Sequence, residues 1–223
     1  GEKGFFNQVT GPFDLEVDAF GKSGKNFKIL DTYIKYYPSE YHSQAGVEAA
    51  LKLRDRIKVD NIEKVNIETY DACVDIIAGE KEKWSPQTRE TADHSLPYCV
   101  AVALFDGKVG LEQFLEQRIQ DTELQKFLSK IKVKRNEEHS KQYPQSFPCF
   151  IEIKSNAGDI FSETVDYPKG HPDNPLSDRE VEDKFKDLNN DCIKSEKVKD
   201  LMKRSWDLEN LKNMKDLITL IKC

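Results

Sequence analysis

One long apolar segment, from His94 to Phe105 (His-Ser-Leu-Pro-Tyr-Cys-Val-Ala-Val-Ala-Leu-Phe), constrains this chain more than any other feature. A run of that length is typical of a buried helix, because strands are usually shorter. Pro97 belongs in the first turn of such a helix, where no backbone donor is lost. Gly107 and Gly110 mark its exit. We therefore expect a globular body that encloses this helix.

The other patterns in this body predict an α+β fold. Val65 to Tyr70 alternates apolar and polar residues, which indicates a half-buried strand. Two more alternating runs, 150–154 and 160–165, flank a polar turn and predict a β-hairpin. Helices are expected over 43–58, 71–78, 111–117 and 121–131, the last with Asp121 as N-cap, and residues 1–40 are expected to form loops and short strands.

The sequence changes character after about residue 170. Ser177 and Glu180 fit a capping box at a helix start, and Val181, Phe185 and Leu188 follow on one face. Two or three further helices are expected in 194–222. We therefore predict two parts, an α+β body over residues 1–170 and an all-helical tail over residues 171–223.

The composition excludes several classes of protein. Hydrophobic residues make up 38% and charged residues 33% of the chain, and the net charge of −6 is spread without basic blocks. That balance does not fit a nucleic-acid binder, and no apolar run is long enough to cross a bilayer. The five cysteines are widely spaced, without the close pairs that structural zinc or iron–sulfur sites usually need. We expect reduced thiols, a cytoplasmic location, no metal, and a small molecule or a protein as partner.

His42 stands directly before the helix expected to start at Ser43. Polar groups at a helix start lie beside free backbone N–H groups, and these together can bind carboxylates or phosphates. The alternative is that His42 or Ser43 only caps that helix.

His94 and Tyr98 are four residues apart, so we expect them to share one face at the start of the buried helix, with Ser95 beside them. A histidine and a tyrosine that face one cavity can act as general base and general acid, or can hold a substrate oxygen. The alternative is a hydrogen-bonded core histidine with a tyrosine packed next to it.

The two remaining histidines are weaker candidates. His171 lies in a Gly/Pro-rich loop that either seals a site or only connects two layers, and His139 lies in a polar stretch where we expect it to be solvated. The sequence contains no GxSxG, P-loop, GxGxxG or HExxH motif.

Three segments, in order, resemble the MmgE/PrpD family. Lys35 to Gln44 (Lys-Tyr-Tyr-Pro-Ser-Glu-Tyr-His-Ser-Gln), with Val47 to Leu51 after it, resembles that family's first block. Arg89 to Tyr98 resembles the second. Tyr167 to Leu176, with Glu182 to Phe185 after it, resembles the third. Because the three blocks are spread over most of the chain, the resemblance is specific.

The resemblance implies a two-part enzyme. An all-helical domain comes mainly from the N-terminal half, an α+β lid-type domain follows, and the last helices return to the helical domain. We therefore expect residues 1–170 to form the lid-type domain and 171–223 to pack on an N-terminal helical half that lies outside this sequence. The family also implies a homodimer and a reaction without a metal or organic cofactor.

The family's activities are dehydration of 2-methylcitrate, decarboxylation of cis-aconitate and epimerisation of iminodisuccinate, all on small polycarboxylates. We expect His94, Tyr98 and His42 to be catalytic, and we expect Gln44, Lys35, Ser95 and His171 to bind substrate. Gln44 favours the dehydratases within the family. The alternative to an enzyme is a lid-type module for binding or assembly. The enzymatic interpretation depends on the first two blocks converging on one polar cavity.

Overall fold

The computed structural model describes residues 9, 11, 27–189 and 192–221 of the chain. Contacts divide the chain into two compact units, residues 1–34 and residues 35–223. In the first unit the structure describes a short 3-10 helix, η4 (Lys28–Asp31). Across the described residues, every helix is too short or too polar to span a lipid bilayer.

The second unit is built on a mixed sheet of four strands in the order β2-β1-β3-β4. β1 (Ile62–Thr69) pairs in parallel with β2 (Ile131–Arg135) and antiparallel with β3 (Cys149–Ser155). β3 and β4 (Ile160–Val165) form the expected hairpin. The central strands β1 and β3 alternate between buried and partly exposed residues, so the sheet has one covered face and one polar face.

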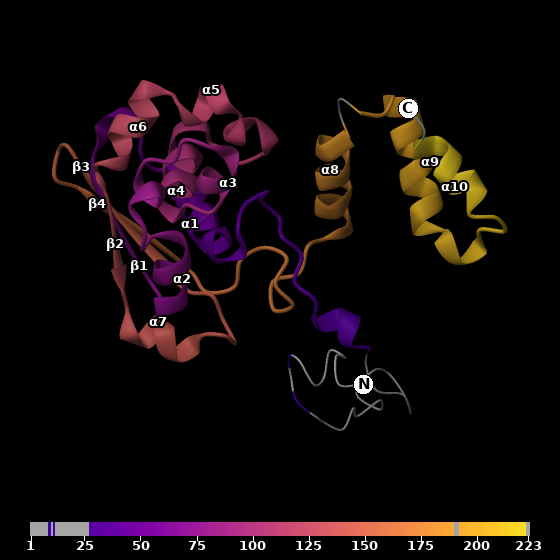
Figure 1. Cartoon of the computed structure of the whole chain (residues 1–223), viewed down its shortest axis with the longest axis horizontal. Coiled ribbons are helices and arrows are strands. Elements are labelled where there is room, and N and C mark those ends of the chain that lie inside the picture. Colours follow the sequence, from indigo (N-terminus) through magenta and orange to yellow (C-terminus); the bar gives the residue numbers. More distant parts are fainter. Residues whose placement is uncertain (1–8, 10, 12–26, 190–191, 222–223) are drawn as a thin grey trace. The chain divides into compact units, whose positions relative to one another are not determined.

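Two helices bring the core to the covered face. α1 (Gln44–Arg54) packs on β3 and β4, and α4 (Leu96–Asp106) packs on α1 and β2. Figure 1 shows both helices along the same side of the strands. Gly46 allows the close approach of α1 to α4, because a Cβ there would lie 2.8 Å from Cδ1 of the fully buried Leu96.

Short helices fill the long connection between β1 and β2. They are α2 (Asp71–Ile77), η7 (Lys81–Trp84), α3 (Arg89–Asp93), η8 (Leu111–Phe114), α5 (Glu116–Ile119) and α6 (Thr122–Leu128). η5 (Tyr41–Ser43) and η6 (Val59–Asn61) precede β1, and α7 (Glu137–Gln142) follows β2. Asp121 caps α6 as expected, because its carboxylate accepts a hydrogen bond from the N–H of Leu124 at 2.9 Å.

The C-terminal part is helical. α8 (Asp178–Asn189), α9 (Ser195–Trp206), η9 (Leu208–Asn210) and α10 (Lys215–Ile221) follow one another. The expected capping box opens α8, where the N–H of Ser177 donates to Glu180 Oε2 at 3.0 Å and the N–H of Glu180 donates back to Ser177 Oγ at 3.3 Å. Lys184 Nζ of α8 donates to the carbonyl of Tyr36 at 2.9 Å, which ties this helix to the chain before η5.

The α+β class with helices at the C-terminus is confirmed, and so are the buried helix over the apolar segment and the hairpin. Three local predictions were wrong. β2 occupies the end of the helix predicted over 121–131, the helix predicted over 43–58 ends at Arg54, and residues 27–40 contain a 3-10 turn where short strands were expected. The rest of the predicted loops and strands over 1–40 lies outside the described residues. The boundary proposed at 170/171 stays a prediction.

Candidate active site

His42 is held in a nearly closed environment at the start of α1. Its Nδ1 lies 2.5 Å from the hydroxyl of Tyr70, which is the residue directly after β1. Its backbone N–H donates to Glu40 Oε2 at 2.6 Å, and the other oxygen of that carboxylate lies 3.9 Å from Nε2. Only 11% of the His42 side chain is exposed. Burial lowers the pKa of His42 below its usual value, against the opposing charge of Glu40.

The alternative, in which the side chain of His42 or Ser43 only caps the helix, does not fit this geometry. Ser43 stands at the N-cap position of α1, but its side chain makes no capping hydrogen bond there. The carboxylate of Glu40 is the side chain that caps η5, and Ser43 Oγ donates to the carbonyl of Glu40 at 2.7 Å. The side chain of His42 therefore makes no capping hydrogen bond and is directed to Tyr70 instead.

Aromatic rings enclose His42 and its partner. Tyr143 stacks on Tyr70 with 4.7 Å between ring centroids, and Phe147 packs edge-on against both rings. The ring centroid of His42 lies 6.1 Å from that of Phe147, and the ring centroid of His171 lies 6.0 Å from the same ring. Phe147 thus brings the histidines of the first and third recognised blocks next to one aromatic cluster.

His94 lies in a more open environment close to this first block. It caps the C-terminus of α3, and 44% of its side chain is exposed. Its Nδ1 lies 2.5 Å from Asp93 Oδ1. The N–H of Glu40 donates to the carbonyl of Asp93 at 2.9 Å, so the chain segments that carry His42 and His94 are joined by a backbone hydrogen bond. The first two blocks therefore lie next to each other. The single polar cavity predicted for His42, His94 and Tyr98 is not formed by all three rings, because the hydroxyl of Tyr98 is directed to Gln113, and a cavity shared by the two histidines stays a prediction.

The expected face shared by His94 and Tyr98 was wrong. The buried helix begins at Leu96, so His94 lies outside it. Tyr98 is fully buried and its hydroxyl donates to the carbonyl of Gln113 at 2.5 Å, while burial raises the pKa of its phenol. Ser95 is the N-cap of α4: its Oγ accepts from the N–H of Tyr98 and donates to the carbonyl of Lys83. Both side chains satisfy core groups, which does not support contact with a substrate.

Gln44 has its side-chain amide fully engaged. Its Oε1 accepts from the N–H of Tyr37 at 2.9 Å, and its Nε2 donates to the carbonyl of Tyr37 and to Ser39. The fully buried amide clamps the turn before η5, which places Glu40 and His42. The predicted contact of Gln44 with substrate, and its use to choose among substrates, lose their geometric basis. Lys35 is exposed at the other end of this turn.

The third block docks on the first through charged groups. The N–H of Lys169 donates to the carboxylate of Glu48 at 2.9 Å, and Lys169 Nζ pairs with Glu180 of α8. This pairing holds the pKa of the Glu180 carboxyl at about 2. His171 is 3% exposed, its Nδ1 accepts from the N–H of Asp173 at 3.0 Å, and burial lowers its pKa. The loop therefore seals part of the aromatic cluster instead of only connecting two layers.

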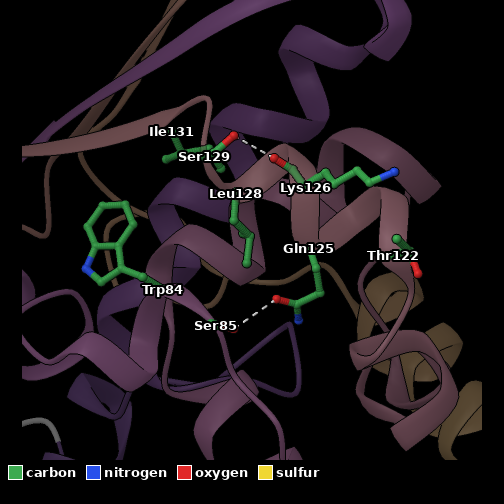
Figure 2. Close-up of a pocket in the computed structure, with 8 residues that line it drawn as sticks. All are labelled: Trp84, Ser85, Thr122, Gln125, Lys126, Leu128, Ser129 and Ile131. Carbon is green, nitrogen blue, oxygen red and sulfur yellow. Dashed lines mark hydrogen bonds between the residues drawn. The ribbon is translucent and has the colours of Figure 1, made fainter.

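A surface hollow of about 560 Å³ lies away from these histidines, between η7 and α6, and Figure 2 shows its lining. Its lining side chains offer no carboxylate or imidazole: they are Trp84, Ser85, Thr122, Gln125, Lys126, Leu128, Ser129 and Ile131. It therefore lacks an acid–base pair. Within the described part of the chain, no three His, Cys, Asp or Glu side chains are grouped so that they could hold a metal ion.

Tyr70 and Glu40 are the residues of this site that sequence reasoning missed. Glu40 lies inside the recognised block, two residues before His42. This spacing could have predicted that its carboxylate interacts with the histidine. Tyr70 stood at the end of a predicted strand, 28 positions away from its partner. A pattern with a period of two places such a residue on a face of the sheet but cannot show what lies opposite it.

A family model described as the MmgE/PrpD C-terminal domain matches residues 37–208. The 2-methylcitrate dehydratase of Salmonella typhimurium is 30% identical over 195 residues, which cover 77% of this chain and 39% of that enzyme. The enzyme of the same name from Escherichia coli (strain K12) is 28% identical over 191 residues, with the same coverage.

A relative with another activity is similar to the same region. The cis-aconitate decarboxylase of Mus musculus is 25% identical over 203 residues, which cover 86% of this chain and 40% of that enzyme. The chain thus spans about two fifths of the length of the curated relatives that it matches.

Proposed function

The chain belongs to the MmgE/PrpD family through its C-terminal domain, and on that premise we propose that it supplies the α+β part of a hydro-lyase that dehydrates 2-methylcitrate or a related tricarboxylate. A helical half of the kind found in the N-terminal part of the family completes the site. The proposal includes a homodimer and a cytoplasmic location, as the family resemblance and the buried thiols lead us to expect.

The observation that supports this proposal most is the junction of the first two blocks. The hydrogen bond from the N–H of Glu40 to the carbonyl of Asp93 holds His42 and His94 on adjoining segments. Their partners differ in kind, because His42 faces a phenol and His94 faces a carboxylate. Two imidazoles with unlike partners are suited to two tasks of a dehydration, taking a proton from carbon and holding the departing hydroxyl by a hydrogen bond.

Dehydration removes a proton from a carbon next to a carboxylate, forms a C=C bond with the electrons of that C–H bond, and releases the hydroxyl as water with a second proton. A base takes the first proton and an acid gives the second. We assign the base to His94, since Oδ1 of Asp93 accepts a hydrogen bond from Nδ1–H and leaves Nε2 with its lone pair. His42 holds the departing hydroxyl by a hydrogen bond, and the second proton is the one that His94 has taken from carbon. Lys35 is proposed to bind a carboxylate of the substrate, and Tyr98, Ser95, Gln44 and the buried His171 to support the site.

Decarboxylation of cis-aconitate is the second candidate, favoured by the similarity to the mouse decarboxylase. It also needs an acid, because the carbanion left by CO₂ must be protonated, and it needs no hydroxyl to leave. The two reactions therefore differ in product while using the same histidines.

The test supplies 2-methylcitrate and cis-aconitate separately to the chain alone, and to the chain with the N-terminal helical half of an MmgE/PrpD enzyme. Product is identified by proton NMR, and association of the two halves is measured by size-exclusion chromatography. We expect turnover of 2-methylcitrate only when both halves are present. Turnover by the chain alone would overturn the shared site, and turnover of cis-aconitate alone would replace the first activity with the second. Association without any turnover would support the non-catalytic module.

A further inference from the structure

We propose that Tyr70 is a positioning residue that fixes His42 as the Nε2–H tautomer, so that His42 presents a proton and not a lone pair. The catalytic consequence depends on the function proposed above. The tautomer itself is a property of this chain and can be measured without any activity.

The first argument is the position of the phenol proton. Tyr70 is 1% exposed, and within residues 27–189 and 192–221 its hydroxyl has one hydrogen-bond partner, His42 Nδ1 at 2.5 Å. If Nδ1 carried the proton and donated it to the phenol oxygen, the buried O–H of Tyr70 would have no acceptor. Leaving a buried donor without an acceptor is unfavourable. The phenol therefore donates to Nδ1, and the single proton of the neutral imidazole is on Nε2.

The second argument is that neither ring can turn away from the other. Tyr70 is stacked on Tyr143 with planes 12° apart and meets Phe147 edge-on. The backbone of His42 is fixed on both sides of its ring, by its N–H to Glu40 and by its carbonyl, which accepts from Cys73 Sγ at 3.5 Å. The tautomer is thus set by a hydrogen bond between two fixed rings.

The charged and titratable groups around His42 fit this assignment. They are Glu40 before η5, Tyr70 after β1, Cys73 of α2, and Tyr143 after α7. Burial raises the pKa of Tyr70, so its hydroxyl keeps its proton at neutral pH. His42 Nε2 makes no hydrogen bond with the described residues and is not among their buried polar atoms, with Glu40 Oε1 at 3.9 Å. The proton on Nε2 therefore points to the accessible side.

The consequence is a division of labour in the proposed reaction. His42 donates a hydrogen bond from Nε2–H to the departing hydroxyl and keeps its proton. The C–O bond breaks, and the hydroxyl leaves as water with the proton that His94 took from carbon. His42 in this tautomer cannot take the proton from carbon, so the base must be another group.

The experiment uses this chain with ¹⁵N-labelled histidine. Long-range proton–nitrogen NMR spectra distinguish a protonated ring nitrogen from one with a lone pair, and the signals of His42 are identified by their loss in His42→Gln. We expect Nε2 to be protonated and Nδ1 to carry the lone pair. In Tyr70→Phe we expect a mixture of tautomers, and a titration midpoint of His42 that rises by about one pH unit, because the donor that favoured the neutral ring is gone.

Tyr143→Phe is the matched control, because it removes a hydroxyl from the same aromatic stack without touching the hydrogen bond to Nδ1. It should leave the tautomer of His42 unchanged. A proton on Nδ1 in the unaltered chain would overturn the proposal even if Tyr70→Phe failed to fold, and so would an unchanged tautomer in a folded Tyr70→Phe. In the assembled enzyme, Tyr70→Phe should lower kcat and move its pH profile with little change in KM. Absence of turnover in the assembled enzyme with the unaltered chain would refute the proposed function, and the tautomer assigned to His42 would still stand.

Discussion

The two histidines of the candidate site differ in what stands behind them. His42 is nearly enclosed, with the hydroxyl of a buried tyrosine at Nδ1, whereas His94 is 44% exposed, with a carboxylate at Nδ1. A donor behind one ring and an acceptor behind the other leave opposite groups at the two Nε2 atoms. The comparison teaches that one residue type can present a hydrogen-bond donor or a basic lone pair in the same site, according to its partner.

The largest expected effect comes from removing the enclosed ring. His42→Ala in the assembled enzyme should lower kcat/KM by about 10²- to 10³-fold, which is the usual cost of removing one positioned hydrogen-bond donor. The measurement is steady-state kinetics on 2-methylcitrate, with circular dichroism to confirm folding. An unchanged rate in a folded variant would remove His42 from the chemistry and break the comparison.

The next effect reverses the partner of the exposed ring. Asp93→Asn replaces an acceptor with an amide that can donate to Nδ1, so the lone pair on Nε2 of His94 is lost and kcat should fall by about tenfold. Asp75→Asn is the matched control, since Asp75 is an exposed carboxylate paired with Arg135 away from the histidines. Equal kinetics for the two variants would mean that Asp93 does not set the state of His94.

A smaller effect is expected for Tyr98, which lies outside the comparison of His42 and His94 and should affect stability but not the reaction. Tyr98→Phe leaves the buried carbonyl of Gln113 without its donor, which should lower the free energy of unfolding by about 1–2 kcal/mol. Urea denaturation measures this loss. The kcat/KM of the folded enzyme should not change. If kcat fell with unchanged stability, Tyr98 would return to the catalytic role predicted from the sequence.

The smallest effect follows the pH dependence of stability. Burial lowers the pKa of both His42 and His171 in the folded chain. As pH falls below about 6.5, these two histidines bind protons in the unfolded chain but stay neutral in the folded chain. The free energy of unfolding therefore decreases. The contribution of these two histidines to the free energy of unfolding is fully present above this pH and is lost as the pH falls. Urea midpoints across this range should fall less steeply in His171→Gln than in the unaltered chain, and parallel curves would contradict the assignment.

Sequence patterns predicted the parts of this molecule that depend on neighbours along the chain. The apolar segment around Val100, the hairpin and the Ser177 capping box are local signals, and the structure contains each of them. β2 escaped prediction because a short alternating run, Ile131 to Arg135, follows a helix without a strong turn signal. A strand of this kind is selected by its pairing with β1, and pairing depends on residues that are distant in sequence.

The candidate site divides in the same way. The recognised blocks identified His42 and His94 but could not separate side chains that face a site from side chains that hold it together. Gln44 and Tyr98 belong to the second kind, because their polar atoms are spent on backbone groups of Tyr37 and Gln113. Only the fold reveals which polar atoms are already paired.

The position of β1 in the sheet also bears on how the chain is made. β1 lies between β2 and β3, and both neighbours come later in the sequence, across the connection that holds the buried helix α4. During synthesis β1 leaves the ribosome long before either partner strand, with both of its hydrogen-bonding edges open. Contacts so distant in sequence slow folding and expose strand edges in the meantime. The edge of β1 that pairs with β3 therefore stays open to non-native pairing until Ser155, the last residue of β3, has been made.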